Sequence, residues 1–113
     1  MRYLLLLHVD ESGWPSLTPP EQAEAMAAYG AFGAALADAG AVVASGRLAS
    51  SASASSLRTI GGKPVVTDGP FAETKEQVAG FYLIEAETPA AAQAWAARCP
   101  AVRYGAVEVR AVA

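Results

Sequence analysis

The chain has 113 residues, of which 53% are hydrophobic and 17% charged, and this composition indicates one globular domain with a single core. The formal net charge is -3 and the eight lysine and arginine residues are scattered, which argues against nucleic acid as a direct ligand. A single cysteine excludes an internal disulfide, and no apolar stretch is long enough to cross a membrane, so we expect a cytoplasmic protein.

The N-terminal third predicts a strand followed by a helix. Residues 2–9 form a short apolar run that is typical of a strand covered on both faces. After a loop over residues 10–17, Thr18 and Glu21 have the spacing of a capping box, and Gly40 is placed to end the helix that it starts. The predicted buried stripe of this helix consists of Met26, Tyr29, Phe32 and Leu36.

The remainder predicts two strands, a hairpin, a second helix and a last strand. Residues 41–49 are a less apolar strand, and the polar stretch 50–56 is expected to be a mobile loop. Two short runs flank Gly61-Gly62, which predicts a β-hairpin over residues 57–67. A strand over 79–87, a helix between Thr88 and Pro100, and a strand over 106–112 complete the chain.

This order of elements predicts an α+β fold over a single domain, residues 1–113. It is a ferredoxin-like βαββαβ arrangement with an inserted β-hairpin and an antiparallel sheet. Its first and third core strands are central, and residues 3–7 and 81–84 are accordingly apolar on both faces. The strands expected at the edges carry the polar residues Ser45, Arg47, Glu108 and Arg110.

Two helices can cover only one face of such a sheet. The other face is four strands wide, and its projected area is on the order of 350 Å² from ordinary strand spacings. Much of this face comes from the apolar central strands, and an exposed patch of that kind usually marks a partner surface. We therefore expect a homodimer in which two sheets pack face to face.

One long motif carries a family resemblance. The segment "DGPFAETKEQVAGFYLIE", residues 68–85, resembles the signature of DGPF-type proteins in the YCII-related family. The segments "RYLLLLHVDE", "MAAYGAFGAAL" and "AAQAWAARCP" are also similar, so the resemblance covers nearly the whole chain. It implies a dimeric α+β barrel. Some members resemble small barrel enzymes that act on ring or lactone substrates through a proposed His–Asp pair, and related genes beside extracytoplasmic-function sigma factors imply an accessory regulatory role.

Two residues are candidate catalytic groups. Asp68 of the motif either caps a turn with its carboxylate or acts as a general base at a strand end. His8, the only histidine, is either a hydrogen-bonded neutral side chain or a proton-transfer partner. Because the first and third core strands are expected to be neighbours, the two side chains can meet.

Four further residues are candidate ligand contacts. Lys75 can hold an anionic substrate and Glu73 can act as an acid, or both can belong to a solvated loop with a weak ion pair. Tyr82 and Phe81 have opposite parity, and we expect Tyr82 to face the cavity of the dimer. Arg47 can bind a carboxylate with two hydrogen bonds or remain a solvated rim charge.

No cofactor or metal is expected, because the single His8 and a Cys99 predicted to be buried and inert form no ligand-spaced cluster. Two classes of function follow. One is a protein that binds a small organic acid, ring or lactone and can carry out acid–base chemistry on it. The other is a non-catalytic accessory module.

Overall fold

The two most apolar segments of the chain form the centre of a four-stranded sheet. The computed structural model describes residues 1–113, and in it β1 (Arg2–Val9) pairs antiparallel with β5 (Gln77–Glu85). β2 (Val42–Arg47) flanks β5 and β6 (Ala106–Ala111) flanks β1, both antiparallel, so the order is β2-β5-β1-β6. The predicted α+β ferredoxin-like fold is confirmed, including the central position of the first and third core strands.

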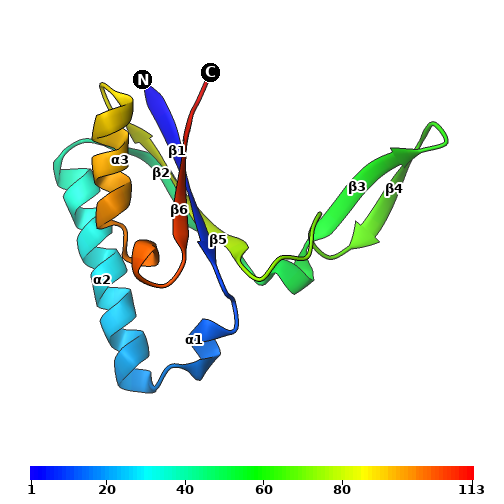
Figure 1. Ribbon diagram of the computed structural model, residues 1–113, viewed down its shortest axis with the longest axis horizontal. Coiled ribbons are helices and arrows are strands. Elements are labelled where there is room, and N and C mark those ends of the chain that lie inside the picture. Colours follow the sequence, from blue (N-terminus) through cyan, green and yellow to red (C-terminus); the bar gives the residue numbers. More distant parts are fainter.

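Two capped helices lie on one side of this sheet (Figure 1). α2 (Pro19–Asp38) starts at the predicted capping box, in which Glu21 N–H donates to Thr18 Oγ1 and Thr18 N–H donates to the Glu21 carboxylate. α3 (Pro89–Arg98) is capped by Thr88, whose hydroxyl accepts from the Ala91 N–H without a reciprocal side-chain hydrogen bond. Although α2 has 20 residues, neither it nor any shorter helix has the sustained apolar length of a membrane span.

The core lies between the helices and the sheet. Alternate residues of β1 point toward the helices, and α2 contributes Phe32 and Leu36 as predicted. Met26 differs from the prediction and is 55% exposed, because the first turns of α2 extend beyond the end of the sheet. The hydrophobic core cluster consists of Tyr3, Leu5, Leu7, Phe32, Leu36, Ala41, Ile84, Ala92, Ala96, Cys99 and Ala101.

The other side of the sheet has no covering layer. Leu4 and Leu6 of β1 alternate with the core residues and lie opposite Leu83 and Phe81 of β5. These four side chains, which we call the open face, are only partly buried. The expectation that two helices cover a single face is therefore correct.

The predicted hairpin forms and stands apart from the sheet. β3 (Ser55–Ile60) and β4 (Lys63–Asp68) pair only with each other, and residues 55–68 are called the arm below. Its two turn residues, Gly61 and Gly62, have φ of 59° and 79°, which only glycine adopts easily and which a tight primed turn requires. Figure 1 shows the arm extending away from the sheet, on the side opposite the helices.

Three short helical turns complete the chain. They are α1 (Gly13–Ser16), η1 (Ser51–Ser53) and η2 (Pro100–Arg103). The segment expected to be a mobile loop contains η1, and it is anchored at Ser51. The Ser51 N–H and hydroxyl both donate to the Glu11 carboxylate, at 2.8 and 2.6 Å. A long-range contact of this kind leaves no local pattern in the sequence.

Candidate functional site

A large hollow lies between the helices and the sheet. It has a volume of about 790 Å³ and is bounded by α1, α2 and the ends of β1, β2 and β5. Its lining is mainly apolar, with a few polar groups that converge on it. We call it the helix-side cavity and define it by Trp14, Met26, Tyr29, Arg47, Tyr82 and Tyr104.

A stacked cation marks the rim of the helix-side cavity. Arg47 is the last residue of β2, and its guanidinium carbon lies 5.2 Å from the centroid of the Trp14 ring in α1. A guanidinium over an indole face is held by cation–π attraction and keeps its planar donors free. None of the ion pairs of the structure includes Arg47, so its charge has no carboxylate partner.

Tyr82 faces the helices, which corrects the expectation that it faces the space between two sheets. Its ring packs edge to face on Phe32 of α2, with centroids 5.0 Å apart. Tyr82 shares its side of β5 with Ile84, which is fully buried in the core, whereas Phe81 belongs to the open face. Burial raises the pKa of the Tyr82 phenol, so its hydroxyl stays protonated and can donate to a ligand.

Two further tyrosines meet across the helix-side cavity. The Tyr29 hydroxyl of α2 is hydrogen-bonded to the hydroxyl of Tyr104, which follows η2. Burial, and secondly this hydrogen bond, raise the pKa of the Tyr29 phenol. The sequence placed Tyr29 in the core and did not single out Trp14 or Tyr104, because both lie in short irregular segments without periodicity.

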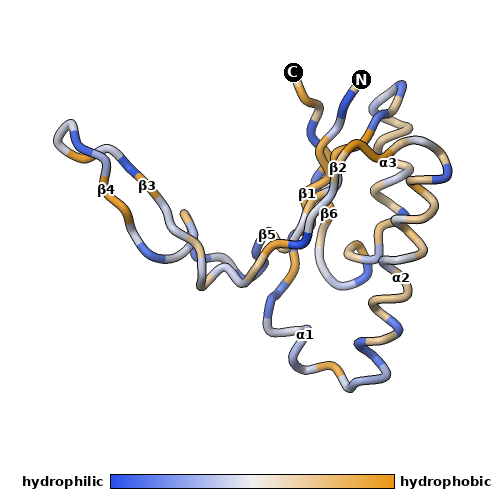
Figure 2. The backbone as a smooth tube through the Cα atoms, turned by 180° about the vertical axis from the view of Figure 1, so that it is seen from behind, coloured by the Kyte–Doolittle hydropathy of each residue, from blue (hydrophilic) through white to orange (hydrophobic).

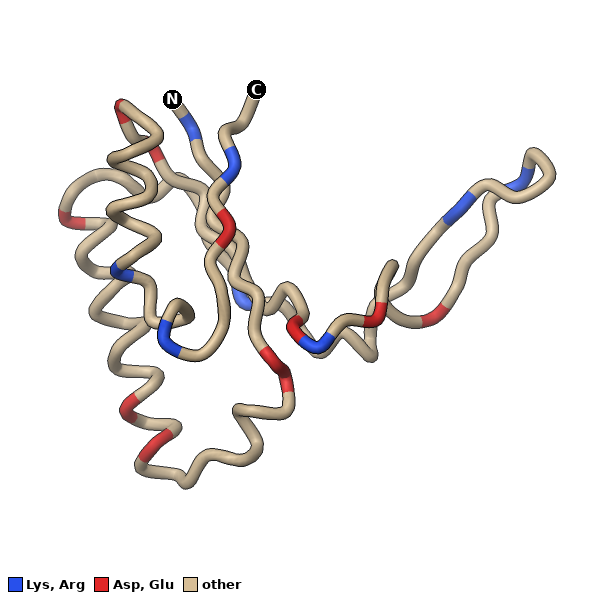
Figure 3. The backbone as a smooth tube through the Cα atoms, in the orientation of Figure 1, with Lys and Arg blue, Asp and Glu red and all other residues tan.

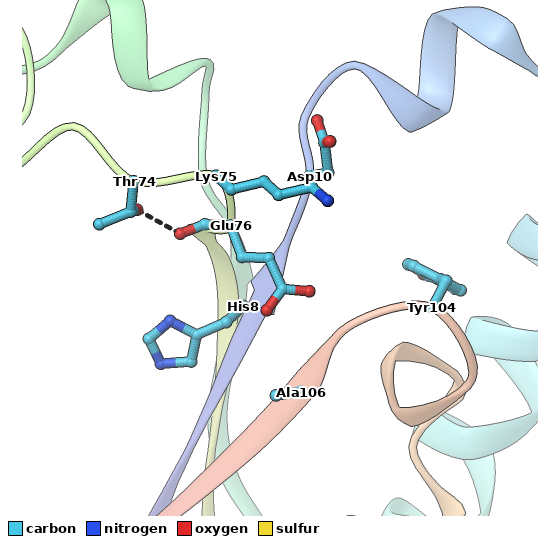
Figure 4. A pocket seen from close by; sticks show the side chains of 7 residues that line it. All are labelled: His8, Asp10, Thr74, Lys75, Glu76, Tyr104 and Ala106. Carbon is cyan, nitrogen blue, oxygen red and sulfur yellow. Dashed lines mark hydrogen bonds between the residues drawn. The ribbon is translucent and has the colours of Figure 1, made fainter.

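His8 lies in a second, more open cleft of about 760 Å³ (Figure 4). Lys75 and Glu76 line it together with Asp10, and the Lys75 side chain extends toward Asp10. Two hydrogen bonds from Ser12 are the main cause of the lowered pKa of the Asp10 carboxyl, and the charge of Lys75 adds to it.

The hydrogen-bond partner of His8 is a carboxylate on the neighbouring strand. His8 Nε2 lies 2.9 Å from Oε1 of Glu108 in β6, on the same side of the sheet as the open face. The other carboxylate oxygen of Glu108 accepts from Arg110. Arg110 first, and His8 second, hold the pKa of Glu108 below its usual value.

Asp68 and Glu73 line neither hollow. Asp68 ends β4 on the arm, opposite Ser55, and its side chain makes no hydrogen bond. The turn after it is held by the backbone, because Gly69 N–H donates to the carbonyl of Ala54. The structure therefore does not bring His8 and Asp68 together within one protomer. The reason is that residues 69–76 separate Asp68 from β5, so the motif begins on the arm and reaches the sheet only at Gln77.

Charge and potential metal ligands are dispersed over the folded chain. Figure 3 shows the lysine and arginine positions spread along the backbone without a basic cluster. No group of three or more His, Cys, Asp or Glu side chains lies together. Cys99 is buried, and burial raises the pKa of its thiol.

Fold and site together define a ferredoxin-like α+β protein with an aromatic cavity between its helices and its sheet. The chain belongs to the YCII-related domain family, whose family model matches residues 1–113, and the resemblance seen in the sequence is thereby confirmed. The chain is also similar to an uncharacterised protein of Rhizobium meliloti (strain 1021), with 39% identity over 85 residues. That match covers 75% of this chain and 68% of the relative.

Proposed function

We propose that this protein binds a small organic acid with a ring in the helix-side cavity. The observation that carries the proposal is the unpaired Arg47 guanidinium, stacked on Trp14 at the rim of an apolar hollow of about 790 Å³. Ligand pockets have volumes of ~300–1,000 Å³ and combine apolar walls with a few placed polar groups. The helix-side cavity has both properties.

Three side chains of the helix-side cavity have a role in this proposal, namely Arg47, Trp14 and Tyr82. Arg47 donates to the carboxylate of the ligand, because its fork of N–H donors matches two carboxylate oxygens. The rings of Trp14 and Tyr82 pack against the ring of the ligand. The protonated Tyr82 hydroxyl, whose pKa burial raises, donates to a carbonyl or ring oxygen. A lactone with a carboxylate side chain fits the same set of groups.

Acid–base chemistry by Asp68 and His8 is a separate step of the proposal. Neither residue lines the helix-side cavity, and His8 is engaged with Glu108. Catalysis by Asp68 on a ligand in this cavity would therefore need Asp68 from outside its own protomer. Binding is the part of the function that the contacts of a single chain support.

We also propose that the protein is a homodimer with two sheets packed across the open face. Leu4, Leu6, Phe81 and Leu83 support this arrangement, because they present adjacent apolar side chains with no covering element. The His8–Glu108–Arg110 group lies at the same face and provides a polar margin.

A binding measurement with matched arginine variants tests the ligand proposal. Calorimetry compares benzoate, salicylate and cyclohexanecarboxylate with their neutral amides. We expect carboxylates to bind better than amides, and Arg47→Gln to weaken carboxylate binding about tenfold, as loss of a charged hydrogen-bond pair predicts. Arg58→Gln is the control, because Arg58 also stacks on an aromatic ring, that of Phe71, but on the arm.

Two results would contradict the ligand proposal. One is an equal affinity of the Arg47→Gln and Arg58→Gln variants for the carboxylates, which would show that the carboxylate contacts neither guanidinium. The other is the absence of binding by any of the six compounds to the wild-type protein. That second result would favour the non-catalytic accessory module.

A further inference from the structure

The arm gives the protomer a shape that a single folded domain of this size does not have. The radius of gyration is 16.0 Å and the principal extents are 49 × 40 × 18 Å. A compact chain of this length has a radius of gyration of about 13 Å. The excess arises from the arm, which extends from the sheet and whose strands pair only with each other (Figure 1).

One face of the arm is apolar and uncovered. Leu57 of β3 lies directly opposite Val66 of β4, so both side chains are on the same face, and they are 65% and 62% exposed. The opposite face is mixed: it carries Ile60 and Val65, which are 62% and 38% exposed, together with the cations Lys63 and Arg58. The Arg58 guanidinium lies 4.8 Å from the centroid of the Phe71 ring. An isolated two-stranded hairpin is at best marginally stable in water. The face of Leu57 and Val66 thus lacks the packing surface that a stable hairpin needs.

The arm lies on the side of the sheet where the open face is. Figure 1 shows the sheet between the helices on one side and the arm on the other, and Figure 2 shows hydrophobic stretches along β4 and near the turn of the arm. A body seated on Leu4, Leu6, Phe81 and Leu83 would lie beside the arm. The two apolar surfaces are placed to contact the same neighbour.

The areas indicate that the open face alone is a small interface. Its projected area is about 350 Å². Each partner in a stable protein complex buries about 800 Å² of accessible surface. One face of the arm adds about 190 Å² by the same strand spacings. In a twofold pair each protomer contributes one arm and receives another, which brings the projected area to about 700 Å² per protomer.

We propose that the arm of each protomer clasps a second copy of this chain, with Leu57 and Val66 packed against the partner. The inference rests on the dimer proposed above and adds that the arm supplies about half of the interface. The occupant is a second copy because reciprocal clasping covers the open face and both arms with one symmetric contact. The clasp also places Asp68, at the base of the arm, at the boundary between protomers.

Introducing lysine on either face of the arm tests this proposal, with the dimer dissociation constant measured by sedimentation. We expect the double variant Leu57→Lys/Val66→Lys to raise the dimer dissociation constant at least about tenfold, as loss of a central apolar contact predicts. The matched control is Ile60→Lys/Val65→Lys, which adds the same charge on the opposite face of the same strands. It should change the dissociation constant by less than about twofold. None of the four residues belongs to the core, so each variant should retain the wild-type circular dichroism spectrum.

A photocrosslinker and a sheet variant separate the clasp from the dimer itself. With benzoylphenylalanine at position 66, we expect a covalent dimer on irradiation. Crosslinks confined to one chain would overturn the clasp. Equal dissociation constants for both arm variants, together with a monomeric Leu6→Lys variant, would overturn the clasp and leave the dimer intact. A wild-type protein that sediments as a monomer at about 100 µM would overturn both, without bearing on ligand binding by Arg47.

Discussion

At the scale of single residues, function depends on which polar groups have partners. Arg47 stacks on Trp14 and has no carboxylate partner, whereas Glu108 holds both His8 and Arg110. The opposite parity of Phe81 and Tyr82 was read correctly from the sequence, but Tyr82 faces the helices and not the side expected to form the cavity of the dimer. Strand parity states only that two side chains face opposite sides, and packing on the helices decides which side is buried.

The hydrogen bonds of Glu108 predict an acid-dependent contribution to stability. Its pKa in the folded protein is lowered from the ordinary value of 4.5 by Arg110 and His8. The contribution is therefore complete above pH 4.5 and is lost as pH falls through the lowered folded pKa. We expect Glu108→Gln to reduce the free energy of unfolding at neutral pH, and the difference from wild type to shrink below pH 4.5.

Urea unfolding at a series of pH values measures this difference. Glu24→Gln is the control, since Glu24 is exposed on α2 and takes part in no ion pair. A constant difference between Glu108→Gln and wild type across the acid range would show that the hydrogen bonds of Glu108 do not stabilise the folded state.

At the scale of secondary-structure elements, glycines mark where strands approach closely. Gly105 precedes β6, and a Cβ atom there would overlap the backbone carbonyl oxygen of His8. Gly30 lies in the interior of α2, and a Cβ atom there would meet nothing within 4 Å. One glycine is therefore required by strand packing, whereas the other only weakens a helix.

Alanine at these two positions should change stability in opposite directions. We expect Gly105→Ala to reduce the free energy of unfolding by about 2–4 kcal/mol, because β6 must move away from β1. Gly30→Ala should raise it by about 0.5–1 kcal/mol through helix propensity. Thermal and urea unfolding of both variants measure these changes. A neutral Gly105→Ala would mean that β6 adjusts without loss of pairing.

At the scale of the whole molecule, the arm and the open face leave apolar surface that one copy cannot cover. Hydrogen exchange of the arm amides measures whether a second copy covers it. We expect exchange over residues 57–66 to be slower in wild type than in Leu6→Lys, because the clasp orders the hairpin only in the dimer. Core amides of β1 outside the substituted position serve as the internal control. Equal exchange of the arm in both proteins would show that the hairpin is ordered without a partner.

The sequence by itself determined the elements, their order and the two strands at the centre of the sheet. A capping box, a glycine pair and alternating apolar residues act over a few positions, so they can be read without coordinates. The family was also evident from the motif at residues 68–85.

Only the tertiary structure decided how the candidate residues are grouped. It placed Asp68 on the arm, away from His8, and joined Arg47 to Trp14 and Tyr29 to Tyr104. These contacts depend on where the arm leaves the sheet and on how α1 and η2 lie beside α2. Such arrangements arise from the packing of segments far apart in the chain, which no local spacing of residues records.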